Sequence, residues 1–186
     1  EILQVHGLEP STISYMGALM LSLQAENADM AAYGGVLALL ERVLPHVPNA
    51  LLVAKSAKMS QVLVAVANSH IEHIAIVRPA LQCAKYLLAA QPARDSANAD
   101  VIKLFRWLLE FVQHAHPKVR QRGQLVCTEL LGECASISVT LSTAVARFVE
   151  ARLSALTVTD TQSALYILNF LKQAFPSLDS LAAASI

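Results

Sequence analysis

The sequence predicts an all-α protein in which about eight antiparallel helices stack in consecutive pairs as an α-solenoid. Apolar residues recur at helical spacing through most of the 186 residues, and strand-like alternation never lasts for more than a few residues. Prolines and short polar turns separate the helical segments. Pairs of segments start near residues 11, 50, 99 and 139, a pitch of about 40–50 residues that is typical of helical solenoid repeats.

The first pair, near residues 11–44, carries a start signal at each helix. Ser11 or Thr12 can cap the first helix and Asp29 the second, because short polar side chains accept hydrogen bonds from the free amides of a helix start. Pro45 ends the pair, since the residue before a proline avoids the helical region. The residues expected to face inward are Ile13, Met16, Leu19, Met20, Leu23, Tyr33, Val36, Leu37, Leu40, Val43 and Leu44.

The second pair, near residues 50–90, is interrupted by a proline. Asn49 begins its first helix, which runs to about residue 68. Pro79 falls inside the second helix, at about residues 71–90, and predicts either a kink or a fresh helix start there.

The third pair, near residues 99–133, begins with the most clearly amphipathic segment of the chain. Leu104 and Leu108 share one face of this segment, while charged and polar residues recur on the other. Val119, Val126 and Leu130 keep the same spacing in the next helix. We expect these five side chains to form one core between the two helices of the pair.

The fourth pair, near residues 139–175, contains a capped second helix. Asp160 precedes it and has the usual role of a helix cap. Pro176 ends the helix. The residues expected to face inward are Leu165, Leu168, Leu171, Ala174 and Phe175.

The start of the helix at Pro117 has the pattern of a HEAT repeat. A proline at the first helical position loses no hydrogen bond and has a suitable fixed φ. It is followed by Val119, Arg120 and, three residues further, the small Gly123. This order of proline, valine, arginine and small residue is the usual form of the second HEAT helix. The solenoid is therefore expected to be of the HEAT or armadillo type.

The composition places these helices in an array. Hydrophobic residues make up 55% of the chain and charged residues 15%, with a mean hydropathy of +0.48. The longest uncharged stretch, residues 10–25, is shorter than the ~20 residues that a bilayer requires, so we expect no membrane partner. Apolar surface on several sides of the helices fits packing along an array. Residues 1–186 are therefore expected to be a fragment of one longer α-solenoid, whose other repeats are its partners.

Neither the charge balance nor the cysteines indicate a special partner. Lysine plus arginine equals aspartate plus glutamate, at fourteen each. Cys83, Cys127 and Cys134 form no CxxC motif and lie among apolar neighbours at helical spacing. They are expected to be buried thiols in a reducing compartment rather than disulfides or metal ligands.

Three stretches of the chain carry a family resemblance: residues 15–20 with 32–48, residues 116–124 and residues 159–176. In these stretches, the sequence resembles the ribosomal RNA-processing protein twelve-like HEAT-repeat proteins of small-subunit ribosome biogenesis. The likeness covers about residues 11–178, in the family's amino-terminal solenoid. Two features depart from it: Gly123, where the repeat usually has alanine, and the loop at residues 91–98.

The resemblance implies a non-catalytic scaffold in small ribosomal subunit biogenesis, pre-ribosomal RNA processing and pre-ribosome export. It implies small-subunit assembly factors as partners, with pre-ribosomal RNA as a further one. It also implies a location in the nucleolus and nucleus, with shuttling to the cytoplasm. The alternative is a nuclear transport receptor of the importin or exportin kind, which is built from similar repeats.

The sequence indicates neither an enzyme nor a bound cofactor. No nucleophile elbow, HExxH, P-loop or GxGxxG motif is present. The pairs His70 with His73 and His114 with His116 lack further ligands at recognised spacing, so no metal site is predicted. The consecutive glycines at residues 34–35 lie inside an apolar helical run, where they favour close helix packing.

The candidate binding residues are Lys118, Arg120 and Arg122, at the helix start behind Pro117. The positive end of the helix dipole adds to their charge. Lys118 and Arg122 are four residues apart and share a helix face. They are therefore the better pair for a polyanion or an acidic partner, and Arg120 is the better candidate for a salt bridge between repeats. The alternative for the whole cluster is a structural role.

Overall fold

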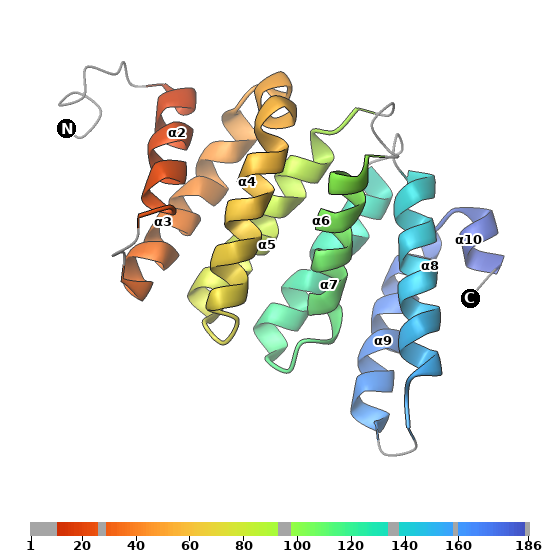
Figure 1. Ribbon diagram of the computed structural model, residues 1–186. Helices are drawn as coiled ribbons and strands as arrows, with labels where there is room; N and C mark the ends of the chain where they lie inside the picture. The colour runs from red at the N-terminus through yellow and green to blue at the C-terminus, as the bar shows by residue number, and fades with distance from the viewer. Residues whose placement is uncertain (1–10, 26–28, 93–97, 134–137, 158–159, 185–186) are drawn as a thin grey trace. The chain divides into compact units, whose positions relative to one another are not determined.

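The computed structural model describes residues 11–25, 29–92, 98–133, 138–157 and 160–184, and regular structure in these ranges is entirely helical (Figure 1). The predicted all-α class is thus confirmed. The described ranges contain eight helices of eleven residues or more and a final helix of five residues. The α-helices are α2 (Thr12–Ser22), α3 (Met30–Val43), α4 (Asn49–Ser69), α5 (Ile74–Ala89), α6 (Ala99–Glu110), α7 (Pro117–Glu133), α8 (Ser138–Ser154), α9 (Thr161–Ala174) and α10 (Ser180–Ala184). The 3₁₀ turns are η1 (Leu44–His46), η3 (Phe111–Gln113) and η4 (Phe175–Ser177).

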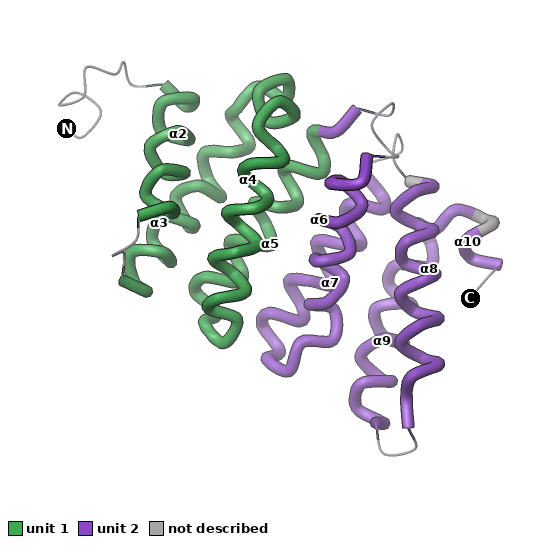
Figure 2. Tube along the Cα trace, viewed as in Figure 1, with its two compact units in different colours: residues 1–90 green, residues 91–186 purple. Residues whose placement is uncertain are grey.

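The helices fall into two compact units, residues 1–90 and residues 91–186 (Figure 2). In unit 1, α2 packs on α3 and α4 on α5, and α3 also packs on α5. In unit 2, α6 packs on α7 and α8 on α9, while α6 and α8 lie together and α10 packs on α8. Consecutive helices within each unit run antiparallel (Figure 1). That all four pairs form one fragment of a longer solenoid stays a prediction.

Two predicted caps are present as hydrogen bonds. Ser14 N–H donates to Ser11 Oγ over 3.1 Å at the start of α2. Ala32 N–H donates to Asp29 Oδ1 over 2.6 Å at the start of α3. These bonds satisfy amides that the first helical turn leaves without partners. The predicted start points of both helices are therefore confirmed.

The prolines mark helix ends and one unusual interior position. Pro45 and Pro176 lie in the 3₁₀ turns that follow α3 and α9, and Pro117 is the first residue of α7. Pro79 lies inside α5, which continues through it, so it does not start a fresh helix. Because proline has no N–H, the carbonyl of Ala75 receives no intrahelical hydrogen bond from residue 79.

The core of unit 1 depends on close approach between α3 and α5. Gly34 is buried, and a Cβ atom added there would lie 3.4 Å from the carbonyl oxygen of Ala75. Leu37 and Leu40, one and two turns further along α3, are fully buried. Gly34 therefore has the predicted role in helix packing. Its neighbour Gly35 is exposed and has no neighbour within 4 Å of the same position.

The core of unit 2 contains the five residues predicted to lie between α6 and α7. Leu108, Val119, Val126 and Leu130 are fully buried and Leu104 is 5% exposed. Their burial is as predicted.

The inward face predicted for α9 was wrong for two of its leucines, whereas Ala174 is fully buried as predicted. Leu165 and Leu168 are 60% and 50% exposed, whereas Ile167 and Phe170 are fully buried. Helix α9 has apolar residues on more than one side, so its periodicity fits two rotations about the helix axis. The rotation found buries the large Phe170 ring in place of two leucines. Among the other residues predicted to face inward, Phe175 is 51% exposed and Ile13 is 48% exposed.

Helix α4 is long and apolar enough to cross a membrane by length and composition, which the sequence analysis did not notice. Its most apolar window has a mean hydropathy of 1.5, and 28% of that window is buried. Lys55 and Lys58 lie near its middle and are exposed; a lysine at the centre of a bilayer costs about 2.5–3.5 kcal/mol. Leu52 and Leu63 bury one side of the helix within unit 1. These features fit a helix packed in unit 1.

Candidate functional site

The candidate site is the start of α7, where a tight turn leads from α6 into the second helix of the pair. His114 N–H donates to the carbonyl of Phe111 over 3.2 Å, which closes η3. His116 N–H then donates to His114 Nδ1 over 3.1 Å, and Lys118 N–H donates to His116 Nδ1 over 3.2 Å. The His116 imidazole thus accepts a hydrogen bond that serine or aspartate accepts at other helix starts, and the His114 imidazole holds the turn just before the helix.

Arg120 is held by the turn and by the next helix pair. Its Nη1 atom donates to the carbonyls of His114 and Ala115, over 2.8 and 3.0 Å. Its guanidinium carbon lies 3.6 Å from the centre of the Tyr166 ring on α9. The contact between repeats predicted for Arg120 is present, but it is a cation–π contact and not the predicted salt bridge.

Lys118 and Arg122 differ in their surroundings. The Lys118 side chain is exposed, whereas Arg122 is half-buried and its Nε atom is buried. The predicted binding pair therefore consists of one exposed ammonium and one guanidinium that is partly covered by the fold. Lys118 is the residue of the cluster best placed to meet a partner.

Lys118, Arg120 and Arg122 together are called the Lys118 ridge, and basic residues on neighbouring helices could extend it. Lys103 and Arg106 on α6 and Arg147 on α8 are exposed. Arg152 on α8 instead donates to Glu110 at the end of α6, forming an ion pair between helix pairs. Exposed ion pairs of this kind contribute little to stability, about 0–1 kcal/mol.

Beside the ridge lies a buried polar residue that the sequence analysis missed. Gln124 is 4% exposed, and its Nε2 atom donates to the carbonyls of Val112, over 2.9 Å, and Tyr166, over 3.3 Å. Its Oε1 atom accepts from Asn169 Nδ2 over 3.2 Å. One amide thus joins α7 to the η3 turn and to α9. No signal in the sequence indicated this burial, because a glutamine in a helix usually faces solvent.

The structure shows why residue 123 is glycine, where this repeat usually has alanine. A Cβ atom at this position would lie 2.9 Å from the carbonyl oxygen of Phe111 and 3.0 Å from its carbonyl carbon. These distances are shorter than van der Waals contact allows. The glycine lets α7 approach the end of α6, where the Phe111 ring also meets the Trp107 ring at 5.0 Å.

The cysteines and histidines that the sequence analysis considered are next. Cys83 and Cys127 are buried, as predicted, and burial raises the pKa of both thiols far above the ordinary value. Cys134 lies outside the described residues. His70 contacts the Tyr33 ring at 5.2 Å and the carbonyl of Val66. Within the described ranges, no three potential ligands come together as a metal site.

Asp160 precedes α9 as predicted but does not cap it with its side chain. Its Oδ2 atom accepts hydrogen bonds from the hydroxyl of Thr157, over 2.7 Å, and from the amide of Thr157, over 3.0 Å. These two bonds hold the pKa of the Asp160 carboxyl below its usual value. The predicted cap was therefore wrong, because the carboxylate stabilises the preceding turn instead.

Comparison with known proteins gives these helix pairs a family. A family model described as RRP12-like, N-terminal HEAT repeats matches residues 1–186. The chain belongs to this RRP12-like family. It is 26% identical over 135 residues to the RRP12-like protein of Homo sapiens and 27% identical over 135 residues to that of Gallus gallus. Each match covers 71% of this chain and 10% of the relative. The chain thus matches a small part of the RRP12-like proteins, and the predicted HEAT fold and family are both confirmed.

Proposed function

We propose that this chain is a non-catalytic HEAT-repeat scaffold in small ribosomal subunit biogenesis, acting in pre-ribosomal RNA processing and pre-ribosome export. The observation that carries the proposal is the match of all 186 residues to the RRP12-like HEAT repeats. HEAT arrays present extended surfaces built from repeated helix pairs, which suits docking rather than chemistry on a substrate. The scaffold needs no cofactor in this proposal.

The partners in this proposal are small-subunit assembly factors, with pre-ribosomal RNA as a second one. The protein works in the nucleolus and nucleus and shuttles to the cytoplasm with its particle. These assignments rest on what the family resemblance of the sequence implies. Because the chain covers 10% of its relatives, they concern a longer protein.

Within this scaffold, Lys118 makes the contact with a polyanion, and Arg122 supports it. Lys118 is exposed at the amino-terminal end of α7, where the helix dipole favours negative charge. Arg122 lies one turn further on the same side, and its partly covered side chain is held close to the surface. Phosphate contacts of this kind depend strongly on salt, because they release condensed cations.

The test uses tagged full-length protein purified from cells at two salt concentrations. Small-subunit precursor RNA in the purified material is measured by reverse-transcription PCR against large-subunit precursor RNA. We expect the small-subunit precursor to be enriched. Lys118→Glu with Arg122→Glu should lower the enrichment, and more so at the lower salt, where the charges are less screened. Arg42→Glu with Lys172→Glu, at two exposed positions on α3 and α9 outside the ridge, is the control because it makes the same change in charge.

Two results would count against these proposals. Equal recovery of both precursors, or recovery of cargo with importin-type signals, would contradict the role in small-subunit biogenesis and favour a transport receptor. Enrichment that survives the double charge reversal would contradict the ridge alone and leave the scaffold role standing.

A further inference from the structure

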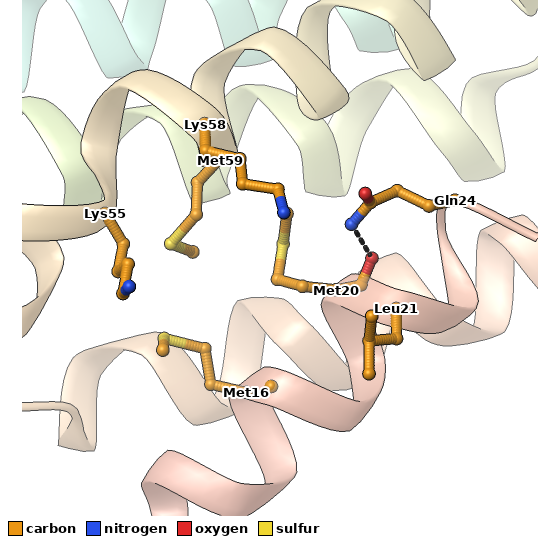
Figure 3. A pocket seen from close by; sticks show the side chains of 8 residues that line it. Met16, Met20, Leu21, Gln24, Lys55, Lys58 and Met59 are labelled. Atoms are coloured by element: carbon orange, nitrogen blue, oxygen red, sulfur yellow. Dashed lines mark hydrogen bonds between the residues drawn. The ribbon is translucent and has the colours of Figure 1, made fainter.

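Unit 1 has an open hollow between α2 and α4, separate from the Lys118 ridge (Figure 3). Its volume is about 250 Å³. Ligand sites for drug-sized molecules are usually larger, about 300–1,000 Å³. A hollow of this size is better suited to an inserted side chain than to a whole small molecule.

The floor of the hollow is made of methionine. Met16 and Met20 come from α2 and Met59 from α4, and their side chains point toward one another (Figure 3). They are only 3–8% exposed, yet they form the inner wall of an open site. Methionine is unbranched and adaptable, so it can repack around different apolar side chains.

The rim of the hollow is apolar on one side and cationic on the other. Leu21, on α2, is 69% exposed. Lys55 and Lys58 stand opposite, three residues apart on α4 and both exposed (Figure 3). In the described part of the chain, neither ammonium forms an ion pair with a carboxylate. Gln24 is also at the rim, but its amide already donates to the carbonyl of Met20 over 2.9 Å.

We propose that this hollow binds an amphipathic, acidic segment of a partner protein. One apolar side chain of the segment inserts between Met16, Met20 and Met59. Carboxylates about one helical turn away meet Lys55 and Lys58. This is the helix-in-groove mode of recognition, in which anchors at i and i+3 or i+4 fill an apolar groove. The inference goes beyond the proposed function, because it concerns another surface and does not depend on a role in ribosome biogenesis.

Two other occupants fit the same surface less well. Sites for single-stranded nucleic acid stack bases on aromatic rings, and none of the described residues that line this hollow is aromatic. A second copy of the chain would have to match the hollow with itself across a two-fold axis. Helices α2 and α4 carry two lysines and no acidic residue, so such a contact would place like charges together.

The test follows the methionine methyl groups of the 186-residue chain by NMR after ¹³C labelling. The chain has four methionines, and three of them line the hollow. Met30 is 51% exposed on α3 and does not line the hollow, so it is an internal control. The probe is a synthetic 14-residue amphipathic peptide with leucines at i, i+4 and i+7 and glutamates beside them. Two matched peptides replace either the leucines by serine or the glutamates by glutamine.

We expect the first peptide to shift the signals of Met16, Met20 and Met59 while that of Met30 stays in place. Each matched peptide should bind at least about tenfold more weakly. Lys55→Glu with Lys58→Glu should weaken the first peptide by about tenfold, because two exposed attractions become repulsions. Leu21→Ser, on an exposed side chain that does not support the fold, should weaken binding without changing the melting temperature.

Several outcomes would overturn the proposal. They are equal shifts of all four methionines, no shift at millimolar peptide, or equal binding of the peptide that lacks glutamates. Larger shifts with a twelve-residue oligouridine would assign the hollow to RNA. Shifts that appear on concentrating the chain alone would assign it to a second copy. Lys103→Glu, in unit 2, must leave peptide binding unchanged.

Discussion

The two units connect their helix pairs by different chemistry. In unit 1, α3 and α5 meet through Gly34, Ala75 and fully buried leucines, so the contact is apolar and depends on close approach. In unit 2, the second helices of the two pairs are joined by the amide of Gln124 and by Arg120 on the Tyr166 ring. Two variants of one repeat thus use packing in one place and directed polar contacts in another.

This difference has consequences for the surface of each unit. Polar groups used between helices are not available to a partner, and in unit 2 this applies to Arg120 and to the pair of Arg152 with Glu110. In unit 1, Lys55 and Lys58 stand beside an open apolar hollow. Arg120 and Arg152 thus make contacts within the fold, whereas Lys55 and Lys58 are placed to bind a partner.

The largest expected effect tests what the two units have in common, their leucine cores. Leu108→Ala or Leu130→Ala in unit 2 should lower the free energy of unfolding by about 2–5 kcal/mol, because both side chains are fully buried. Leu40→Ala in unit 1 should cost a similar amount. Urea unfolding followed by circular dichroism measures all three. A melting curve unchanged by Leu108→Ala and by Leu130→Ala would contradict the packing of α6 on α7.

The next effect concerns close approach in unit 2. Gly123→Ala should lower stability by about 1–3 kcal/mol, because its Cβ would overlap the backbone of Phe111. Gly35→Ala is the matched control in unit 1, where no described atom beyond the neighbouring backbone of α3 lies within 4 Å of the added Cβ. It should raise stability by up to about 1 kcal/mol, since alanine favours the helix. If both substitutions change the stability in the same direction, α7 is not packed against Phe111 as described.

Replacing the buried amide of Gln124 gives the sharpest contrast in stability between the units. Gln124→Leu should cost about 1–3 kcal/mol, because the carbonyl of Val112 and the amide of Asn169 lose their partner while the volume is nearly kept. Gln61→Leu, at an exposed position of α4, should change stability by less than about 0.5 kcal/mol. Thermal melting of both variants tests the contrast, and equal losses would remove it.

Arg120 and Lys118 should separate stability from binding at one helix start. Arg120→Ala should lower the free energy of unfolding by roughly 1–2 kcal/mol, since it removes two hydrogen bonds and the contact with Tyr166. Lys118→Ala should change it by less than about 0.5 kcal/mol. The reverse order in chemical denaturation would mean that Arg120 is a surface residue and Lys118 a structural one.

The smallest expected effect is a dependence on pH. The pKa of Asp160 is lower in the folded chain than in the unfolded chain, because Thr157 donates to the carboxylate. Its contribution to stability is therefore present above the unfolded pKa and is lost as the pH falls through the folded pKa. Asp160→Asn should reduce the loss of stability on acidification, measured as melting temperature against pH. Glu150→Gln, at an exposed position of α8, is the control.

Local signals made much of the fold predictable. Ser11, Asp29 and Pro117 act on the residues next to them, so the starts of their helices could be read directly from the sequence. The core between α6 and α7 was predictable because Leu108 and Leu130 belong to strong helical stripes.

The contacts between helix pairs were not predictable in the same way. Gln124 and Tyr166 are 42 residues apart, and a glutamine in a helix usually faces solvent. In α9, apolar residues on several sides left the rotation of the helix open, and the neighbouring helices decided it. The partner of Arg120 was missed for the same reason, because an aromatic ring from another repeat replaced the expected carboxylate.

Pro79 weakens the start of α5, and this affects how the helix opens locally. The first turn of α5 lacks one backbone hydrogen bond to the rest of the helix, so it is held by the burial of Ile76 and Val77. Local opening should therefore begin at this turn, because fewer backbone hydrogen bonds must break there. The carbonyl of Ala75 would then leave Gly34 at the same moment. Fraying of α5 is thus coupled to loosening of α3 around Gly34, and amide hydrogen exchange in the two helices should rise together.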